Sequence, residues 1–369
     1  MSRGKCICMP KACYIHIPFC VSKCKYCSFV SFNKLELITG YVYSLLKEIN
    51  ENYKGEMLDT LYFGGGTPSL IPIELLKKIV NKFGLAQNAE VTIELNPDDG
   101  ALDYIKGLRD IGFNRLSIGS QTFDDELLKL TGRRHNSNQI LETVQNAKKA
   151  GFDNISLDLI YGLPTQTVDG IKTDLCKFLE LDIQHISTYG LKIEGGSYWG
   201  EHNPKNVPND DVQADMYERI NEILKNAGFA RYEVSNFAKQ GFESRHNLTY
   251  WNNEEYYGFG VSAHGYVDGV RYSNYCTIED YMNNPTKHEY GRILSEQEKL
   301  EEEIFLGFRK SEGINTKKIL DKFGVDFEGK YNSILEKYSD YIIKTQEGFA
   351  FNLKGTMLSN EILPEFLEC

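Results

Sequence analysis

The chain has 369 residues, of which 41% are hydrophobic and 25% charged, and its formal net charge is −11. No run approaches the roughly 18 apolar residues of a membrane-spanning helix, so we expect a soluble globular protein without a transmembrane segment. The acidic excess argues against nucleic acid as a partner, because a phosphate backbone requires a basic surface. The length suits one large α/β barrel with an appendage, or two to three domains.

The first residues, MSRGKCICMPKAC, carry positive charge but no apolar stretch of the kind that a secretory signal contains. We therefore expect a cytoplasmic protein whose nine cysteines stay free or bind metal instead of forming disulfides. Met9 would serve as a start codon just ahead of the first strand, so residues 1–12 are interpreted as an N-terminal extension. The roles of Cys6, Cys8 and Cys13 stay open.

Short β-branched runs alternate with amphipathic stretches along the first half of the chain, and the first helix is predicted around residues 35–50. The runs predict six strands, at 14–17, 61–63, 91–95, 116–118, 155–160 and 186–191. Parallel strands with helical crossovers form either an open doubly wound sheet or a (β/α) barrel, complete or partial.

A weak internal repeat supports this organisation. The segments IGFNRLSIG, AGFDNISLD and AGFARYEVS, which begin at Ile111, Ala150 and Ala227, each place Gly-Phe before a predicted strand. We interpret the glycine as the end of one helix and the phenylalanine as the start of the next turn. Chance is the alternative, because glycine after a helix is common.

From Ser295 the pattern changes to short helices followed by a hairpin. SEQE predicts a helix capped by Ser295, NTKKILDKFG a helix closed by Gly324, and YIIKTQEGFAFNL a hairpin around Glu347 and Gly348. This order resembles a winged helix. Residues 295–369 carry 10 Lys and Arg against 15 Asp and Glu, which argues against DNA and for a structural or substrate-covering role.

The most informative motif is the C-x-x-x-C-x-x-C spacing of Cys20, Cys24 and Cys27. Thiolates are the usual ligands of iron–sulfur clusters, and a cubane with four irons and three cysteines leaves one iron without a protein ligand. That iron can take the amino and carboxylate groups of S-adenosylmethionine, and the cluster can cleave the molecule to a 5′-deoxyadenosyl radical. From spacing alone, zinc held by the three cysteines and His16 or another ligand remains an alternative.

The motif resembles the signature of the radical S-adenosylmethionine superfamily, where it follows the first barrel strand, and Tyr26 before the third cysteine fits it too. More narrowly, YIHIPFC is similar to the oxygen-independent coproporphyrinogen III oxidase family. The resemblance runs from about Tyr14 to the C-terminus. It implies a partial (β/α)6 radical S-adenosylmethionine barrel over 13–235, an extension over 236–294 and a winged-helix-like domain over 295–369.

Three glycines follow the second predicted strand in YFGGGTPS, where a plain tight turn is the alternative to a backbone that a ligand approaches closely. Polar residues also end later strands, and such positions tend to be functional in barrels. The resemblance implies that the glycine motif meets the methionine amino group, that Glu94 and Asp158 bind the ribose and that Arg133 pairs with the carboxylate. The full predicted set for S-adenosylmethionine is Tyr14, Tyr26, Gly64, Gly65, Gly66, Thr67, Glu94, Gln121, Arg133 and Asp158.

Two features of the sequence bear on whether the protein is an oxidase or a carrier. The oxidases have a further cysteine two residues after the third, where this chain has Phe29, which puts decarboxylase chemistry in doubt. RHNLTYW contains H-N-x-x-Y-W, which resembles the motif of the HemW group of heme chaperones. The resemblance implies that His246 ligates heme iron, that Asn247 orients it, and that Tyr250 and Trp251 offer flat surface to the porphyrin.

The leading prediction is therefore a chaperone with a 4Fe-4S cluster and S-adenosylmethionine that binds heme and delivers it to apo-hemoproteins such as respiratory enzymes. Peripheral membrane contact is compatible with this. The alternative is an oxidase that decarboxylates coproporphyrinogen III to protoporphyrinogen IX through a 5′-deoxyadenosyl radical. His264, in a further segment that resembles the family, is interpreted as a structural residue.

Overall fold

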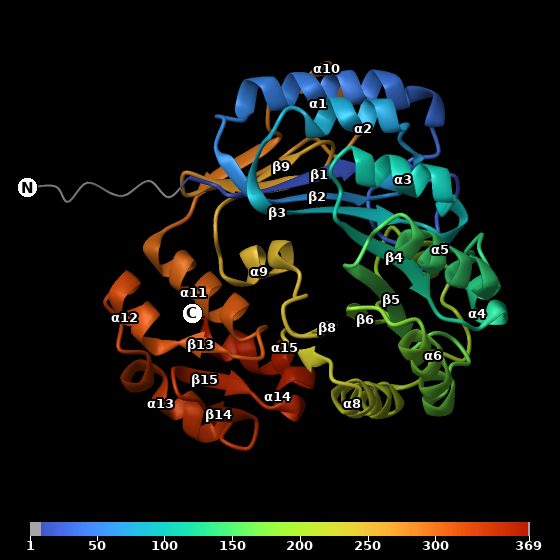
Figure 1. Ribbon diagram of the computed structural model, residues 1–369. Helices are drawn as coiled ribbons and strands as arrows, with labels where there is room; N and C mark the ends of the chain where they lie inside the picture. Colours follow the sequence, from blue (N-terminus) through green and yellow to red (C-terminus); the bar gives the residue numbers. More distant parts are fainter. Residues whose placement is uncertain (1–8, 368–369) are drawn as a thin grey trace, which may run out of the picture.

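The computed structural model describes residues 9–367, so Cys6, Cys8 and Cys369 lie outside the described residues. A twelve-stranded sheet forms its centre, in the order β12-β11-β10-β9-β1-β2-β3-β4-β5-β6-β8-β7. Its parallel core follows chain order, as Figure 1 shows along the arc from β1 to β6. These strands are β1 (Ala12–Ile17), β2 (Met57–Gly65), β3 (Gly84–Leu95), β4 (Arg115–Gln121), β5 (Ile155–Tyr161) and β6 (His185–Gly190). The predicted partial (β/α)6 barrel is confirmed.

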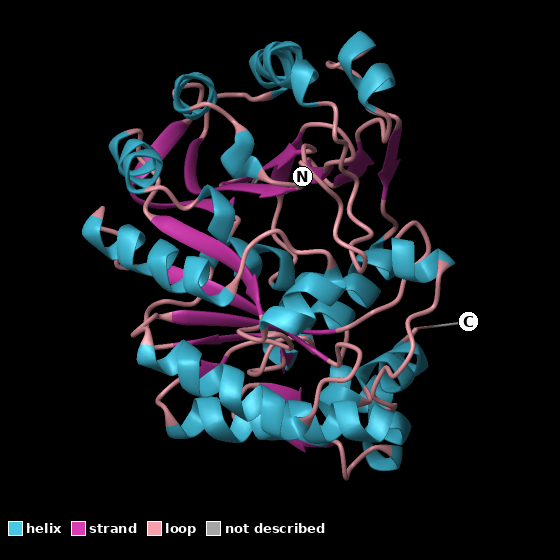
Figure 2. Ribbon diagram, turned by 90° about the vertical axis from the view of Figure 1, so that its right-hand side faces the viewer, coloured by secondary structure: helices cyan, strands magenta, loops and turns pink. Residues whose placement is uncertain are grey.

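Helices connect successive parallel strands and cover the outside of the arc (Figures 1 and 2). Their inner faces are apolar and buried, as Leu45, Ile79 and Leu108 illustrate, each with no exposed surface. This burial drives the helices onto the sheet. The connecting helices are α1 (Ile38–Asn52), α2 (Ile73–Val80), α3 (Leu102–Asp110), α4 (Asp125–Thr131), α5 (Ser137–Lys149) and α6 (Val168–Glu180), and α7 (Tyr198–Glu201) and α8 (Asp210–Asn226) follow β6.

The Gly-Phe repeat marks the ends of α3, α5 and α8. Its glycines have φ values of 109°, 85° and 83°, a left-handed conformation that favours glycine. At each site the phenylalanine amide donates to a carbonyl five residues earlier, as Phe113 does to Leu108 at 3.1 Å. This is the hydrogen bond of a Schellman cap, and the buried ring then anchors the next strand. The same helix end therefore recurs, as the repeat predicts.

The sheet continues beyond the six parallel strands at both edges. β7 (Ala230–Arg231) and β8 (Asn236–Ala238) pair antiparallel beside β6. On the other side β9 (Tyr256–Phe259) lies parallel to β1, and β10 (His264–Val267), β11 (Val270–Ser273) and β12 (Tyr290–Ile293) follow antiparallel. Two helices belong to this part of the chain, α9 (Arg245–Trp251) and α10 (Ile278–Asn283).

The predicted boundary between residues 235 and 236 falls between β7 and β8, two strands that pair with each other. Residues 236–294 are built into the sheet at both edges and are not a separate layer. The physical reason is that an open sheet leaves unpaired backbone groups at its two edges, and the strands of the extension satisfy them. Sequence patterns alone do not reveal such edge pairing.

The C-terminal part has its own core of aromatic and aliphatic side chains, among them Phe308, Phe327 and Phe366. A capping box at Ser295 and Glu298 begins its first helix, and Gly324, with φ of 70°, ends the second, both as predicted. The hairpin of β14 and β15 also forms, and β15 pairs with β13 as well. The elements are α11 (Glu296–Gly307), β13 (Ile314–Asn315), α12 (Thr316–Phe323), α13 (Phe327–Lys337), β14 (Ile342–Lys344), β15 (Gly348–Phe351), α14 (Leu353–Met357) and α15 (Ser359–Ile362).

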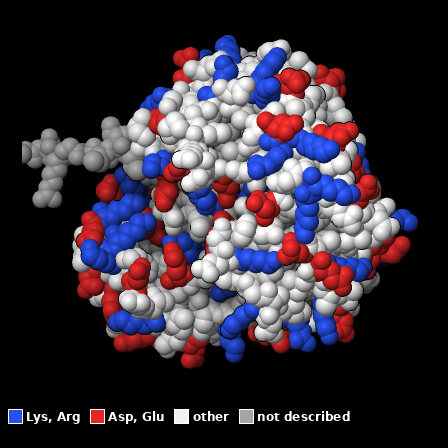
Figure 3. Space-filling view, viewed as in Figure 1, with Lys and Arg blue, Asp and Glu red and all other residues white. Residues whose placement is uncertain are grey.

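Charges of both signs alternate over the face in Figure 3. On α12, Lys317 pairs with Asp321, and Lys318 and Lys322 both pair with the buried carboxylate of Glu303. These lysines are thus partly neutralised, unlike those of a helix that reads DNA phosphates. A separate observation concerns membranes: within residues 9–367, no helix has the length and apolar character needed to cross one.

Candidate functional site

The inside of the barrel is polar. In closed (β/α)8 barrels the inward positions are filled mainly by branched aliphatic side chains. Here the inward side chains meet one another through hydrogen bonds: the Tyr62 hydroxyl donates to Glu94 Oε1 at 2.9 Å, and the Ser117 hydroxyl donates to Asp158 Oδ1 at 3.4 Å. Buried polar groups carry a desolvation cost that aliphatic side chains would avoid. This polar interior therefore indicates a binding site.

A pocket of about 420 Å³ opens at the carboxyl ends of these strands. It is lined by most of the residues predicted from the sequence, namely Cys20, Cys24, Tyr26, Cys27, Gly65, Gly66, Thr67, Glu94, Gln121, Arg133 and Asp158. Six βα units contribute to one mouth, which is where barrel active sites assemble.

The cysteine loop follows β1 and is held at both ends by backbone hydrogen bonds. Phe32 donates to the Pro18 carbonyl at 2.7 Å, and the Lys25 amide donates to the Thr131 carbonyl at 2.9 Å. The Cys20 sulfur lies 3.4 Å from the Thr67 hydroxyl, and a guanidinium nitrogen of Arg133 lies 3.7 Å from the Cys24 sulfur. The three sulfurs therefore face one pocket between fixed neighbours.

Among residues 9–367, no three His, Cys, Asp or Glu side chains converge closely enough to hold a single metal ion. A cubane is larger than one ion and is held by thiolates that approach it from different corners. Cys20, Cys24 and Cys27 all line this one pocket. Three thiols at one pocket agree with the predicted cluster.

The glycine triplet has steric reasons to lack side chains. A Cβ on Gly66 would lie 2.7 Å from the Phe19 carbonyl oxygen, and one on Gly64 would lie 2.9 Å from Glu94 Oε1. Gly65 has φ of 114°, and its amide donates to Glu94 Oε2 at 3.2 Å. Gly64 stands beside the pocket without lining it. The triplet brings backbone close to both the cysteine loop and Glu94.

Glu94 and Asp158 are half-buried carboxyl groups that line the pocket. Burial raises the pKa of Glu94 to about 7, with the neighbouring charge of Asp158 as the next cause. Burial likewise raises the pKa of Asp158 to about 6. Both groups thus change protonation near neutral pH, as functional carboxyl groups often do.

Arg133 is anchored on the far wall of the pocket. One guanidinium nitrogen donates to Asn96 Oδ1 at 2.9 Å and also to the Gly119 carbonyl. Its Nε is buried without a hydrogen-bond partner. A buried donor that lacks a partner is costly, and a ligand carboxylate would satisfy it. The residues present therefore fit the methionine end of S-adenosylmethionine.

Gln121 ends β4 with φ of 66°, a conformation that costs free energy for a residue other than glycine. Such strain concentrates at functional sites. Tyr26 packs on Trp199, with 6.4 Å between ring centroids, and lines the pocket as predicted. Tyr14 does not line it: its hydroxyl lies 3.1 Å from His16 Nδ1 and its ring stacks on Tyr62, one layer deeper in the barrel.

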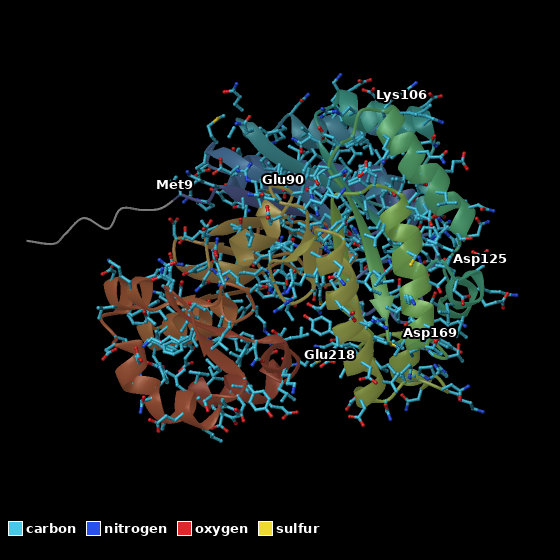
Figure 4. The ribbon with its side chains drawn as sticks, turned by 60° about the horizontal axis from the view of Figure 1, so that its bottom comes forward. Met9, Glu90, Lys106, Asp125, Asp169 and Glu218 are labelled. Atoms are coloured by element: carbon cyan, nitrogen blue, oxygen red, sulfur yellow. The ribbon has the colours of Figure 1, made fainter. Side chains whose placement is uncertain are left out.

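The H-N-x-x-Y-W segment forms α9, which enters the barrel from the amino-terminal side of the strands. Glu90 of β3 accepts hydrogen bonds from the backbone amides of Arg245 and His246 at 3.1 Å each. Figure 4 labels Glu90 beside this helix. A carboxylate at a helix N-terminus is favourable, so Glu90 anchors α9 in the barrel.

The predicted heme ligation by His246 is not supported by this arrangement. His246 Nδ1 lies 2.8 Å from the Thr60 hydroxyl and Nε2 lies 2.8 Å from the Tyr250 hydroxyl, so both ring nitrogens are engaged. The side chain is 1% exposed. Burial lowers the pKa of His246 to about 3 and keeps it neutral. Thr60 and Tyr250, and not Asn247, orient the ring; Tyr250 and Trp251 are half-buried.

Sequence reasoning missed several residues of the site, above all Asn96, Ser117 and Tyr189, which line the pocket. Alternation along the strands could have identified two of them, because residues two apart share a face of a strand. Asn96 lies two residues after Glu94, and Ser117 lies two residues before Gly119. Glu90 and Arg115 were also missed. The same alternation places them on the inward faces of β3 and β4, but the local sequence does not show that they are buried.

Comparisons with known proteins agree with this site. Residues 14–175 match the Radical SAM superfamily, and residues 294–348 match the HemN C-terminal domain. The heme chaperone HemW of Lactococcus lactis subsp. lactis (strain IL1403) is 40% identical, with 97% of each chain covered. The heme chaperone HemW of Bacillus subtilis (strain 168) is 36% identical over 97% of this chain and 99% of its own.

Among solved structures, coproporphyrinogen III oxidase (HemN) from Escherichia coli, a radical SAM enzyme, has a TM-score of 0.86. The match covers 97% of this chain and 90% of the oxidase chain. At 22% sequence identity it shows a shared fold. The family assignment rests on the nearly full-length similarity to the two chaperones. On that evidence, the chain belongs to the HemW heme chaperone family within the radical SAM superfamily.

Proposed function

We propose that this protein is a heme chaperone, which binds heme in the cytoplasm and transfers it to apo-hemoproteins such as respiratory enzymes. The observation that carries the proposal is the similarity to proteins named heme chaperones over 97% of the chain. A second observation supports it. Phe29 occupies the position of the further cysteine of the oxidases and is 67% exposed at the pocket rim, so it contributes no thiol.

As a member of the radical SAM superfamily, the chain carries a 4Fe-4S cluster and S-adenosylmethionine. When bound, the cluster supplies the electron that cleaves the sulfonium of S-adenosylmethionine. We assign the thiolates of Cys20, Cys24 and Cys27 to the cluster. Arg133 would bind the carboxylate through its unpartnered Nε, and Glu94 and Asp158 would accept hydrogen bonds from the ribose hydroxyls.

The surface for heme is best sought at the rim of the same pocket. Phe29 and Tyr189 line it and are 67% and 43% exposed, which leaves apolar ring surface in water. Large exposed apolar groups around a pocket mark binding surfaces. Lys23 and Lys192 also line the pocket and offer cations to the propionates of a porphyrin.

A second cleft, of about 630 Å³, lies beside Tyr250 between β11 and α11. It is also partly aromatic, through Tyr250, Tyr256 and Phe305. Its carboxylates, Glu298, Glu301 and Glu302, outnumber its two arginines, and Glu302 and Glu298 already pair with Arg271 and Arg292. A dianionic porphyrin would have to displace these pairs, so the rim of the mouth is the better candidate.

The test is anaerobic reconstitution with iron and sulfide, followed by a heme titration read by absorbance and a transfer assay to an apo-hemoprotein. Saturable heme binding with transfer, and no conversion of coproporphyrinogen III, is the expected result. Turnover of coproporphyrinogen III to protoporphyrinogen IX would identify the protein as an oxidase and contradict the proposal.

A further inference from the structure

Arg115 is a buried charge without a conventional partner. It is the first residue of β4, 2% exposed, and among the largest fully buried side chains of the protein. Its Nε has no hydrogen-bond partner, and no salt bridge joins it to a carboxylate among the described residues. Burying an isolated guanidinium carries a large desolvation cost, so its presence requires a compensating charge or a function.

The strand register places Arg115 beneath the pocket. Arg115 pairs with Thr92 of β3, and two residues further along each strand Ser117 pairs with Glu94. Side chains two residues apart share a face of a strand, so Arg115 and Ser117 both point into the barrel. Ser117, Glu94 and Asp158 line the pocket, whereas Arg115 does not. Its guanidinium is therefore one layer below the two carboxyl groups.

The histidines and phenols near Arg115 supply no negative charge at neutral pH. His185 of β6 and His246 of α9 are buried, and desolvation lowers the pKa of each, with the charge of Arg115 adding to the effect. The pKa values of the Tyr62, Tyr189 and Tyr232 phenols are raised, first by desolvation. Histidines and phenols around Arg115 are thus neutral.

The carboxylates of the barrel interior differ in whether they already accept hydrogen bonds from neighbouring backbone and side chains. Glu233 is occupied by the Ser235 amide and the Asn236 side chain, and Glu90 by the amides of α9. Glu94 and Asp158 remain as possible partners of Arg115. Burial raises the pKa of both groups, and the charge of Asp158 raises that of Glu94 further. Arg115 acts against this increase for both groups, and Arg133 does so for Asp158 from the opposite side.

We propose that Arg115 is a positioning residue for the nucleoside of S-adenosylmethionine: its buried guanidinium is the counter-charge that keeps Glu94 and Asp158 ionised together beneath the ribose. Two neighbouring buried carboxyl groups otherwise tend to share one proton. A protonated carboxyl has lost an acceptor for a ribose hydroxyl. The inference rests on the proposed assignment of Glu94 and Asp158 to the ribose.

The experiment compares Arg115→Met, which removes the charge at similar length, with Arg115→Lys, which keeps it. Binding of S-adenosylmethionine to cluster-reconstituted protein is measured by equilibrium dialysis from pH 6 to pH 9. We expect wild-type affinity to be constant above about pH 8 and to fall as Glu94 and then Asp158 take up protons. In Arg115→Met the midpoint of this fall should move up by about one pH unit, which lowers the affinity at pH 7.5 about threefold. Arg115→Lys should keep the wild-type midpoint.

Calorimetry in buffers of different ionisation enthalpy adds a readout that general damage to the fold does not mimic. Binding at pH 8 should release almost no protons in wild type and about half a proton in Arg115→Met, because the raised midpoint leaves the site about half protonated and that proton must leave before the ribose is recognised. An unchanged pH profile in Arg115→Met, or equal weakening in both variants with an unchanged midpoint, would overturn the proposal.

If Arg115→Met does not fold, the proposal is still tested by Arg115→Lys and by the number of protons that the wild type releases on binding S-adenosylmethionine. A wild type that releases about one proton at pH 8 shows that the two carboxyl groups are not ionised together. Glu94→Gln and Asp158→Asn separate the two levels of the argument. If both bind S-adenosylmethionine like wild type, the ribose assignment itself fails; if both lose binding while the Arg115 variants do not, only the role of Arg115 fails.

Discussion

The imidazole of His246 stacks on the ring of Tyr62, with 5.0 Å between ring centroids and 21° between the planes. The Tyr62 hydroxyl in turn donates to Glu94 in the floor of the pocket. The H-N-x-x-Y-W helix is therefore part of the barrel interior, in contact with a residue that is hydrogen-bonded to a carboxyl group of the pocket. A role for this motif in shaping the pocket follows from its position.

His246 should matter for stability more than for heme ligation. His246→Ala leaves a cavity and two unpaired hydroxyl groups, on Thr60 and Tyr250, so we expect a loss of about 2–4 kcal/mol in the free energy of unfolding. His246→Gln keeps a polar side chain and should bind heme with an unchanged absorption spectrum and an affinity within about twofold of wild type. Denaturant unfolding and heme titration measure the two effects. Loss of the heme spectrum in a folded His246→Gln protein would restore the ligand assignment.

Phe29 should contribute to heme binding and not to the binding of S-adenosylmethionine. Replacing its exposed ring by serine removes apolar contact worth about 1 kcal/mol, so heme affinity should fall about five-fold. Ile293→Ser is a matched control, since Ile293 is an apolar side chain that is 73% exposed on β12, outside the pocket. Heme titrations of both variants check this. Equal heme affinity in Phe29→Ser and Ile293→Ser would place the heme surface elsewhere.

The three cysteines should be separable from the others by cluster content. Cys24→Ser should abolish the visible absorbance and the labile sulfide of the reconstituted protein, because serine does not replace a thiolate ligand well. Cys176→Ser is the control, since Cys176 is exposed on α6. Iron and sulfide analysis after anaerobic reconstitution gives the result. A full cluster in Cys24→Ser, or its loss in Cys176→Ser, would argue against the assignment.

Glu48 should make the protein less stable as the pH rises. This carboxyl of α1 accepts hydrogen bonds from the Gly260 amide, Asn274 and Tyr281, yet burial raises its pKa from 4.5 to about 7. The folded state then binds the proton more tightly than the unfolded state, so this stabilisation is present below about pH 4.5 and is lost as the pH rises towards 7.

Glu48→Gln removes this titration. The free energy of unfolding of the variant relative to wild type should therefore rise by up to about 3 kcal/mol between pH 5 and pH 8, whatever the constant effect of the substitution. Glu279→Gln is the control, because Glu279 is an exposed residue of α10. Denaturant unfolding at several pH values measures both. A pH-independent difference for Glu48→Gln would show that Glu48 is ionised throughout this range.

The sequence by itself determined the features that depend on residues a few positions apart. The six parallel strands, the Gly-Phe helix ends, the capping box at Ser295 and the C-terminal hairpin all follow from local conformational preferences. The cysteine spacing belongs to the same class, because one loop presents all three thiols. Resemblance to a family then supplied roles for residues such as Glu94, near the end of β3, and Arg133, after α4, and both line the pocket.

Only the tertiary structure decided which layer of the barrel each polar side chain occupies. Alternation along a strand shows that Tyr14 and Arg115 point inward, but the depth of each is set by the register between strands distant in sequence. For that reason Tyr14 lies below the pocket and Arg115 beneath its carboxyl groups. The burial of His246 likewise depends on Thr60 and Glu90, which lie more than 150 residues away, and on the open barrel that admits α9.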